Sequence, residues 1–202
     1  MHKIIVLLSA SVALAAATFV ARAEEPVDTT AFAQRLFAVK AVDKKTYACF
    51  VRRYDADHLK HHPLQKVGAM KILMTVEKSE EAASLQYGFQ LGVSLRNQPG
   101  AFSSGGGCSD AKALPEGGRM MISCSVDCDG GGLYVTLASG DKSVVVDLDQ
   151  VRIWDVNKPD EDATHSLRAG ADDKTFRLDR ANVEECTSLV PDHDELEAMR
   201  HQ

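Results

Sequence analysis

The chain alternates between apolar and polar residues over much of its length. The clearest case is the segment 85–95, in which six apolar residues occupy every second position and polar residues or glycines lie between them. A period of two places the apolar side chains on one face of a strand, so the segment is predicted to be a strand with one buried face. Gly88 and Gly92 fall on the opposite face, where glycine favours strong curvature or the close approach of a neighbour. Curvature is what a sheet needs in order to close.

Similar short segments recur along the chain. The further strand candidates are 47–52, 70–76, 120–126, 133–138, 143–148, 151–154 and 175–178. Glycine, proline and serine gather between them, as at 97–100 and 103–107, and indicate turns. About eight short strands without βαβ alternation predict a mainly β fold, a single antiparallel β-barrel or β-sandwich. A short amphipathic helix at 31–39, with Thr30 as its N-cap, is predicted to precede the strands.

The first 23 residues have the three parts of a secretory signal peptide. Lys3 precedes an apolar run over 4–20, and the small-x-small sequence Ala21-Arg22-Ala23 follows it. This order predicts a periplasmic or secreted protein without stable membrane insertion after cleavage, because no second long apolar run follows. An uncleaved anchor is the alternative, since the run approaches the length that spans a bilayer.

The predicted organisation has four parts. Residues 1–23 form the signal peptide, 24–45 a polar leader and the short helix, 46–186 a β-rich domain and 187–202 an acidic C-terminal tail. The whole chain has a formal net charge of −6, with 23 basic and 29 acidic residues. Without Lys3 and Arg22, 21 basic residues remain against 29 acidic ones, a net charge of −8. So acidic a chain is not expected to bind nucleic acid through a general positive field.

The five cysteines all follow the signal peptide, in the part of the chain that would meet an oxidising compartment. An odd number leaves at least one thiol unpaired, and several pairings are open. Cys124 and Cys128 cannot close on each other within one continuous strand, because their Cα atoms would lie about 13 Å apart. We expect disulfides between Cys108 and Cys124 and between Cys128 and Cys186, with Cys49 as an unpaired core residue.

The densest cluster of candidate ligands is a short stretch rich in histidine. On a helix, His58, His61 and His62 would share one face, with Asp55 and Asp57 beside them. Imidazoles three and four residues apart can share Zn or Cu, which makes this stretch the candidate metal site. The alternative is a helical turn capped by one of the aspartates, with histidines that are solvated or hydrogen-bonded locally.

The G-x-S-x-G and H-E-x-x-H motifs of common enzyme classes are absent from the sequence. No catalytic residue and no organic cofactor is therefore assigned. The sequence identifies neither a partner nor an oligomeric state.

Several short motifs occur together in the middle of the chain. They are Tyr47-Ala48-Cys49, then His58-Leu59 with His62-Pro63 and Gln65, and later C-x3-C-D-G-G-G over 124–132. In combination they resemble the YxC, HLxxHPxQ and CxxxCDGGG motifs of a group of uncharacterised exported bacterial proteins, over residues 47–186. The resemblance implies a small periplasmic or secreted β-rich domain and supplies no activity or catalytic residue.

These observations favour a non-enzymatic exported protein that acts as a binding or envelope-associated module. One alternative is a metal-binding protein that uses His58, His61 and His62. Another is a carrier of small apolar ligands, in which the apolar face of 85–95 would line a cavity inside a barrel.

Overall fold

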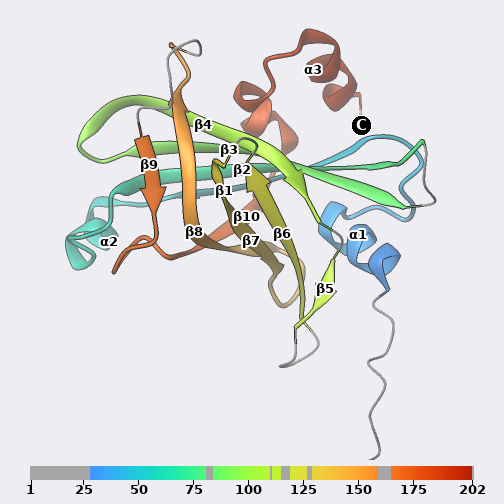
Figure 1. The fold of residues 1–202 in the computed structure, drawn as a ribbon, viewed down its shortest axis with the longest axis horizontal. Helices are drawn as coiled ribbons and strands as arrows, with labels where there is room; N and C mark the ends of the chain where they lie inside the picture. Colours follow the sequence, from blue (N-terminus) through green and yellow to red (C-terminus); the bar gives the residue numbers. More distant parts are fainter. Residues whose placement is uncertain are drawn as a thin grey trace, which may run out of the picture.

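Eight antiparallel strands form a closed ring in this computed structural model, in the order β1-β2-β3-β4-β6-β7-β8-β10 and back to β1 (Figure 1). Residues 28–80, 84–109, 111–114, 119–126, 129–158 and 165–201 are described by the structure. The strands of the ring are β1 (Thr46–Arg53), β2 (Val67–Lys78), β3 (Leu85–Leu95), β4 (Gln98–Cys108), β6 (Met120–Val126), β7 (Gly131–Leu137), β8 (Ser143–Asp155) and β10 (Thr175–Ala181). Two short strands extend the sheet, β5 (Lys112–Ala113) beside β6 and β9 (His165–Arg168) beside β8. The predicted mainly β, antiparallel fold of barrel or sandwich type is confirmed.

The helices are short, and aspartates cap three of them. They are α1 (Thr29–Phe37), α2 (Ala56–His61), the 3-10 helix η1 (Val183–Leu189) and α3 (His193–Arg200). The carboxylates of Asp28, Asp55 and Asp192 each accept a hydrogen bond from a backbone N–H in the first turn of α1, α2 and α3. The N-cap of α1 is therefore Asp28, and the prediction of Thr30 was wrong. Because α1 precedes β1 and α2 follows it, the two helices lie at opposite ends of that strand (Figure 1).

The interior of the ring is filled by apolar side chains. On β3 the predicted alternation holds: Tyr87, Phe89, Leu91 and Val93 are all buried in one core cluster. Phenylalanines from β1, β4 and β10 belong to the same cluster, as do side chains of α1. The 85–95 face thus packs against its neighbours as core.

Turns were predicted at 97–100 and 103–107, but of these residues only Asn97 lies in a turn, and the rest belong to strand β4. Its glycines and serines carry no apolar alternation, so the period that marks the other strands is missing. Pairing with β3, and with β6 at one end, holds the segment extended. A Cβ on Gly106 would lie 2.1 Å from the carbonyl oxygen of Ser125, so the close approach of β6 requires glycine there. Likewise, 143–155 is a single strand, not two.

The C-terminal segment covers the outside of β1 and β2. A second apolar cluster forms there from Tyr47, Cys49 and Leu73 of the strands and from Cys186, Leu189, Val190 and Met199 of the C-terminal segment. Lys45 and Glu195 add an ion pair of 2.6 Å between the start of β1 and α3. We call residues 183–200, which comprise η1 and α3, the C-terminal cap.

Two disulfides are present among the described residues. Cys108 is bonded to Cys124, as predicted, because the two are direct cross-strand neighbours on β4 and β6. Cys49 is bonded to Cys186, with Cα atoms 5.9 Å apart. The predictions of an unpaired Cys49 and of a Cys128–Cys186 bond were therefore wrong. Cys49 points away from the barrel interior, toward the place where η1 crosses β1. Cys128 lies outside the described residues.

The signal peptide prediction concerns residues 1–23, which also lie outside the described part of the chain. Within the described ranges, no helix has both the length and the apolar character to span a membrane.

Candidate ligand-binding groove

The histidine cluster lies on and just after α2, where the chain passes from β1 to β2. Asp55 caps the helix by accepting a hydrogen bond of 2.8 Å from the backbone N–H of His58. The rings of Tyr54, His58 and His62 form a stack, with centroids 4.5 Å and 4.3 Å apart. This stack borders a surface pocket of about 370 Å³. Burial raises the pKa of the Tyr54 phenol.

Local hydrogen bonds hold the histidines. His58 Nε2 donates to Gln65 Oε1 at 3.0 Å, and the buried Gln65 amide donates to the carbonyl of Val67 at the start of β2. His61 Nδ1 donates to the carbonyl oxygen of Asp57 at 2.8 Å. His62 Nδ1 lies 3.7 Å from a carboxylate oxygen of Asp172. These contacts agree with the alternative to a metal site, in which the histidines form local hydrogen bonds. The hydrogen bonds order the connection between β1 and β2.

The candidate metal ligands do not converge. The planes of His58 and His62 are 23° apart, and an imidazole binds a metal in the plane of its ring. Nearly parallel stacked rings therefore direct their lone pairs side by side, not toward one point. Asp55 is used as the helix cap, and His61 binds its own helix backbone. Within the described ranges, no group of three or more His, Cys, Asp or Glu side chains has metal-binding geometry.

A second site, which the sequence analysis did not identify, lies on the outer face of the barrel. The strand register aligns one residue from each of five strands in a row, because the neighbours are directly paired. Along β1, β2, β3, β4 and β8 the row is Val51, Lys71, Gly92, Ser103 and Trp154. Its second member is a cation, Lys71, next to the C-terminal cap, and its last is the single tryptophan of the chain. The two residues between Lys71 and Trp154 are small.

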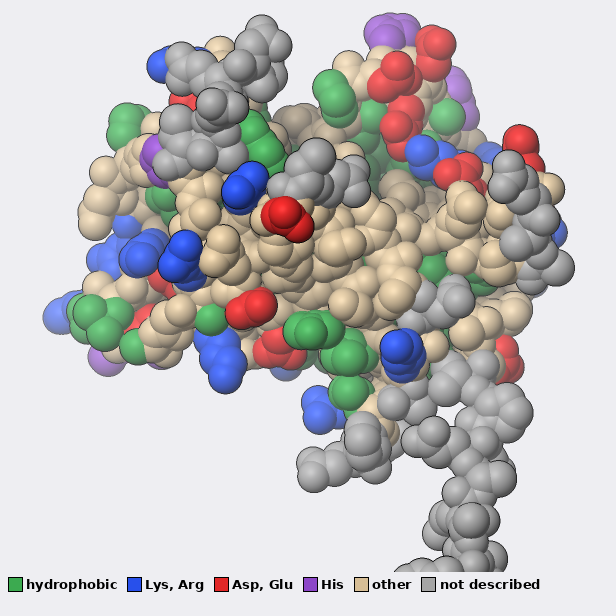
Figure 2. All heavy atoms as spheres, viewed as in Figure 1, with side chains coloured by type: hydrophobic (Ala, Val, Ile, Leu, Met, Phe, Trp, Pro, Cys, Tyr) green, Lys and Arg blue, Asp and Glu red, His purple; other side chains and the backbone are tan. Residues whose placement is uncertain are grey.

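Two adjoining hollows lie over this row. The first, of about 250 Å³, is bordered by Arg53, Lys71 and Ser94, and the second, of about 490 Å³, by Gln90, Ser103 and Trp154. Both share Val156, Ser188 and Leu189 in their walls, so they form one groove between the C-terminal cap and the end of β8. Figure 2 shows α3 of the C-terminal cap as a raised part of the surface at the upper right, with acidic and histidine side chains on it.

The groove exposes apolar surface in an otherwise polar setting. Val156 is 44% exposed, although it is a large aliphatic residue. Leu189 of the cap packs directly on Gly92, where an added Cβ would lie 2.7 Å from Leu189 Cδ2. The glycine on the outer face of 85–95 therefore has the closely approaching neighbour that the sequence indicated. That glycine was the one sequence signal of this site.

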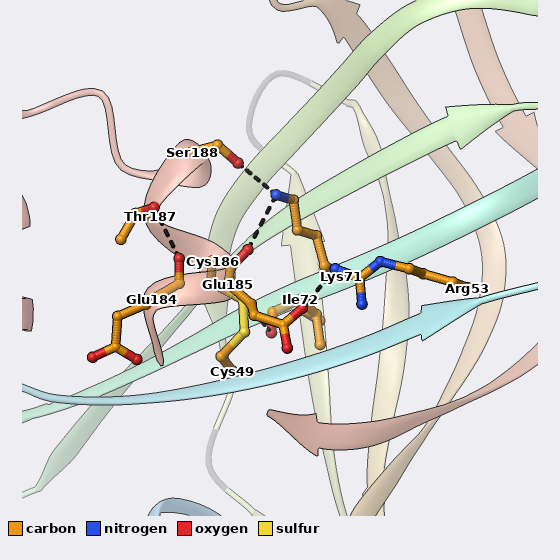
Figure 3. The surroundings of a disulfide bond; sticks show 9 residues. All are labelled: Cys49, Arg53, Lys71, Ile72, Glu184, Glu185, Cys186, Thr187 and Ser188. Carbon is orange, nitrogen blue, oxygen red and sulfur yellow. Dashed lines mark hydrogen bonds and ion pairs between the residues drawn. A yellow bond between two sulfur atoms is a disulfide. The ribbon is translucent and has the colours of Figure 1, made fainter. Parts of the chain in front are cut away.

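Lys71 is the cation of the groove, and Figure 3 shows how it is held. Its Nζ donates to Ser188 Oγ at 2.5 Å and to the carbonyl oxygen of Glu185 at 3.2 Å. Burial lowers the pKa of Lys71, and the nearby Arg53 lowers it further, against an opposing effect of Glu185. The Glu185 carboxylate is itself paired with Arg53 at 2.6 Å (Figure 3). Lys71 thus binds only neutral oxygens among the described residues.

Comparisons with protein-family models, with curated proteins and with solved structures found no match for this chain.

Proposed function

We propose that this protein is an exported, non-enzymatic binding module whose ligand site is the groove between the C-terminal cap and the end of β8. The predicted signal peptide and the two disulfides support export, because structural disulfides persist in oxidising compartments. The observation that carries the binding role is the groove itself: a half-buried tryptophan and an exposed valine beside a half-buried lysine, on the face of a barrel.

Ligand sites combine a concave shape with mainly apolar walls and a few polar groups that orient the ligand. The larger hollow, about 490 Å³, lies within the roughly 300–1,000 Å³ usual for small-molecule sites. Its floor belongs to strands that pair on both sides, and its wall is joined to β1 by the Cys49–Cys186 disulfide. A site built on paired strands and a crosslinked cap is held in place before the ligand arrives, which reduces the entropic cost of binding.

The proposal is tested with the neutral fluorophore N-phenyl-1-naphthylamine, using Trp154 as the internal donor. We expect saturable binding with quenching of tryptophan emission. Ser103→Phe should abolish binding, because the new ring would fill the floor of the larger hollow. Ser123→Phe places the same ring on the exposed face of β6, outside the groove, and should bind as the unaltered protein does. Equal binding by both variants, or no saturable binding to the unaltered protein, would show that the groove is not a ligand site.

A further inference from the structure

We infer that the groove selects an amphipathic anion, with its carboxylate at Lys71 and its apolar part against Trp154. This inference rests on the proposed function and names the class of ligand. Its basis is the order of side chains along the cross-strand row, in which a cation and an aromatic ring are separated by small residues.

The row determines the dimensions of the ligand. Lys71 on β2 and Trp154 on β8 are separated by three strand intervals, through Gly92 and Ser103. At a strand spacing of about 4.8 Å, their backbones lie about 14 Å apart. Leu189 packs over Gly92, and the two hollows adjoin along the shared wall of Val156, Ser188 and Leu189, so an extended molecule that reaches both ends follows this wall. A compact ion would meet only one end.

Charge determines the polarity of the ligand. An ammonium group has three N–H donors, and Lys71 directs two of them to neutral oxygens of η1. The third donor and the positive charge are available to a ligand in the smaller hollow. A carboxylate there would form a charge-assisted hydrogen bond with a half-buried cation, which is stronger than a bond between neutral groups.

The other charged groups of the groove favour the same orientation. The Arg53 guanidinium and the Glu185 carboxylate satisfy each other. Asp155 borders the larger hollow and accepts a hydrogen bond of 2.9 Å from the backbone N–H of Asn157. A negative charge beside Trp154 repels an anionic head from that end, whereas Val156 and the indole ring provide apolar contact. The anion is therefore directed to Lys71.

The experiment compares three ligands that share a ten-carbon chain: decanoate, decan-1-ol and decyltrimethylammonium. Each displaces N-phenyl-1-naphthylamine from the intact protein, and the affinities give the effect of head-group charge. We expect decanoate to bind about tenfold more tightly than the alcohol, and the cation most weakly. If 2-naphthoate also displaces the fluorophore, a planar ring is an acceptable apolar part of the ligand. If it does not, the ligand class is restricted to acyl chains. In both cases the ligand carries a carboxylate.

Variants of Lys71 separate ligand recognition from a structural role. Lys71→Met should lower the affinity for decanoate to that for decan-1-ol, and Lys71→Arg should restore the preference for decanoate. Lys142→Met removes an exposed lysine of the turn before β8 and should keep it. Equal binding of decanoate and decan-1-ol to the unaltered protein would overturn this inference while leaving the proposed function intact. Loss of decan-1-ol binding in Lys71→Met would overturn it too, since Lys71 would then only support the cap. Failure of the fluorophore to bind the unaltered protein refutes the proposed function itself.

Discussion

The Cys49–Cys186 disulfide should contribute more to the free energy of unfolding than the Cys108–Cys124 disulfide, although replacing either cysteine pair by alanine removes the same atoms. The difference lies in the unfolded chain. Cys49 and Cys186 are 137 residues apart and enclose nearly the whole barrel, whereas Cys108 and Cys124 are 16 residues apart and join adjacent strands. A crosslink stabilises the fold mainly by restricting the unfolded ensemble, and a longer closed loop restricts it more.

The expected magnitudes follow from the loop lengths. The chain-entropy relation predicts a stabilisation of about 5 kcal/mol for the long loop and about 3 kcal/mol for the short one at 25 °C. The difference between the two double variants is therefore about 2 kcal/mol. Packing acts in the same direction, because Cys49 and Cys186 are both buried, whereas Cys108 is only half-buried.

Urea unfolding of Cys49→Ala/Cys186→Ala and of Cys108→Ala/Cys124→Ala measures this difference, followed by circular dichroism and by the emission of Trp154. Cys128 is replaced by serine in every protein compared, so that no free thiol can exchange with a disulfide. We expect a lower midpoint for the first variant. If the two variants have the same free energy of unfolding, or the second is less stable, the loop-entropy reasoning does not apply to this barrel.

Three further changes test the packing, the hydrogen bonds and the charges of the fold. Phe89→Ala should lower the free energy of unfolding by about 3–5 kcal/mol, because it leaves a cavity in the core, whereas Val156→Ala on the exposed groove wall should change it by less than about 0.5 kcal/mol; comparable losses in urea unfolding would contradict the assignment of interior and surface. Asp173 is only 2% exposed and accepts hydrogen bonds from the backbone N–H groups of Lys66 and Val67, so Asp173→Ala should cost about 2–3 kcal/mol in the same assay and Asp173→Asn less, because one acceptor oxygen remains. A hydrogen bond from Arg35 holds the pKa of Asp141 below its usual 3.8, and a group whose pKa is lowered by folding stabilises the fold above its unfolded pKa. The stability advantage of the unaltered protein over Asp141→Asn should therefore be present at neutral pH and disappear as the pH falls below about 4; it should stay under about 1 kcal/mol, because both side chains are substantially exposed. An advantage that persists at pH 2 would exclude this ion pair as its source.

Much of the barrel could be predicted because its strands carry their own signal. The alternation at 85–95 marks a strand whatever its partners are, and the buried residues of β3 are the ones that the period of two selects. Strand β4 could not be found in this way, because its serines and glycines have no apolar face. Only pairing with β3 and β6 makes that segment a strand. The N-cap of α2 could also be predicted from the sequence, because Asp55 and His58, whose backbone N–H it binds, are three residues apart.

The two candidate sites differ in how far the sequence alone could identify them, because one is local in sequence and the other depends on strand pairing. His58, His61 and His62 are close in sequence, so the sequence could identify the cluster, but ring orientation decided that their lone pairs do not converge. Lys71 and Trp154 are 83 positions apart in the sequence and belong to one groove only because strand register places Gly92 and Ser103 between them.

By itself, the sequence determined the mainly β fold and the buried face of β3, because each depends on periodicity within short segments. Tertiary structure alone decided the partner of Cys49 and the existence of the groove. The path of η1 across β1 brings Cys186 to Cys49, and the register of five strands brings Lys71 into line with Trp154. Both depend on the closure of the ring, which is a property of all its strands together and of no single segment.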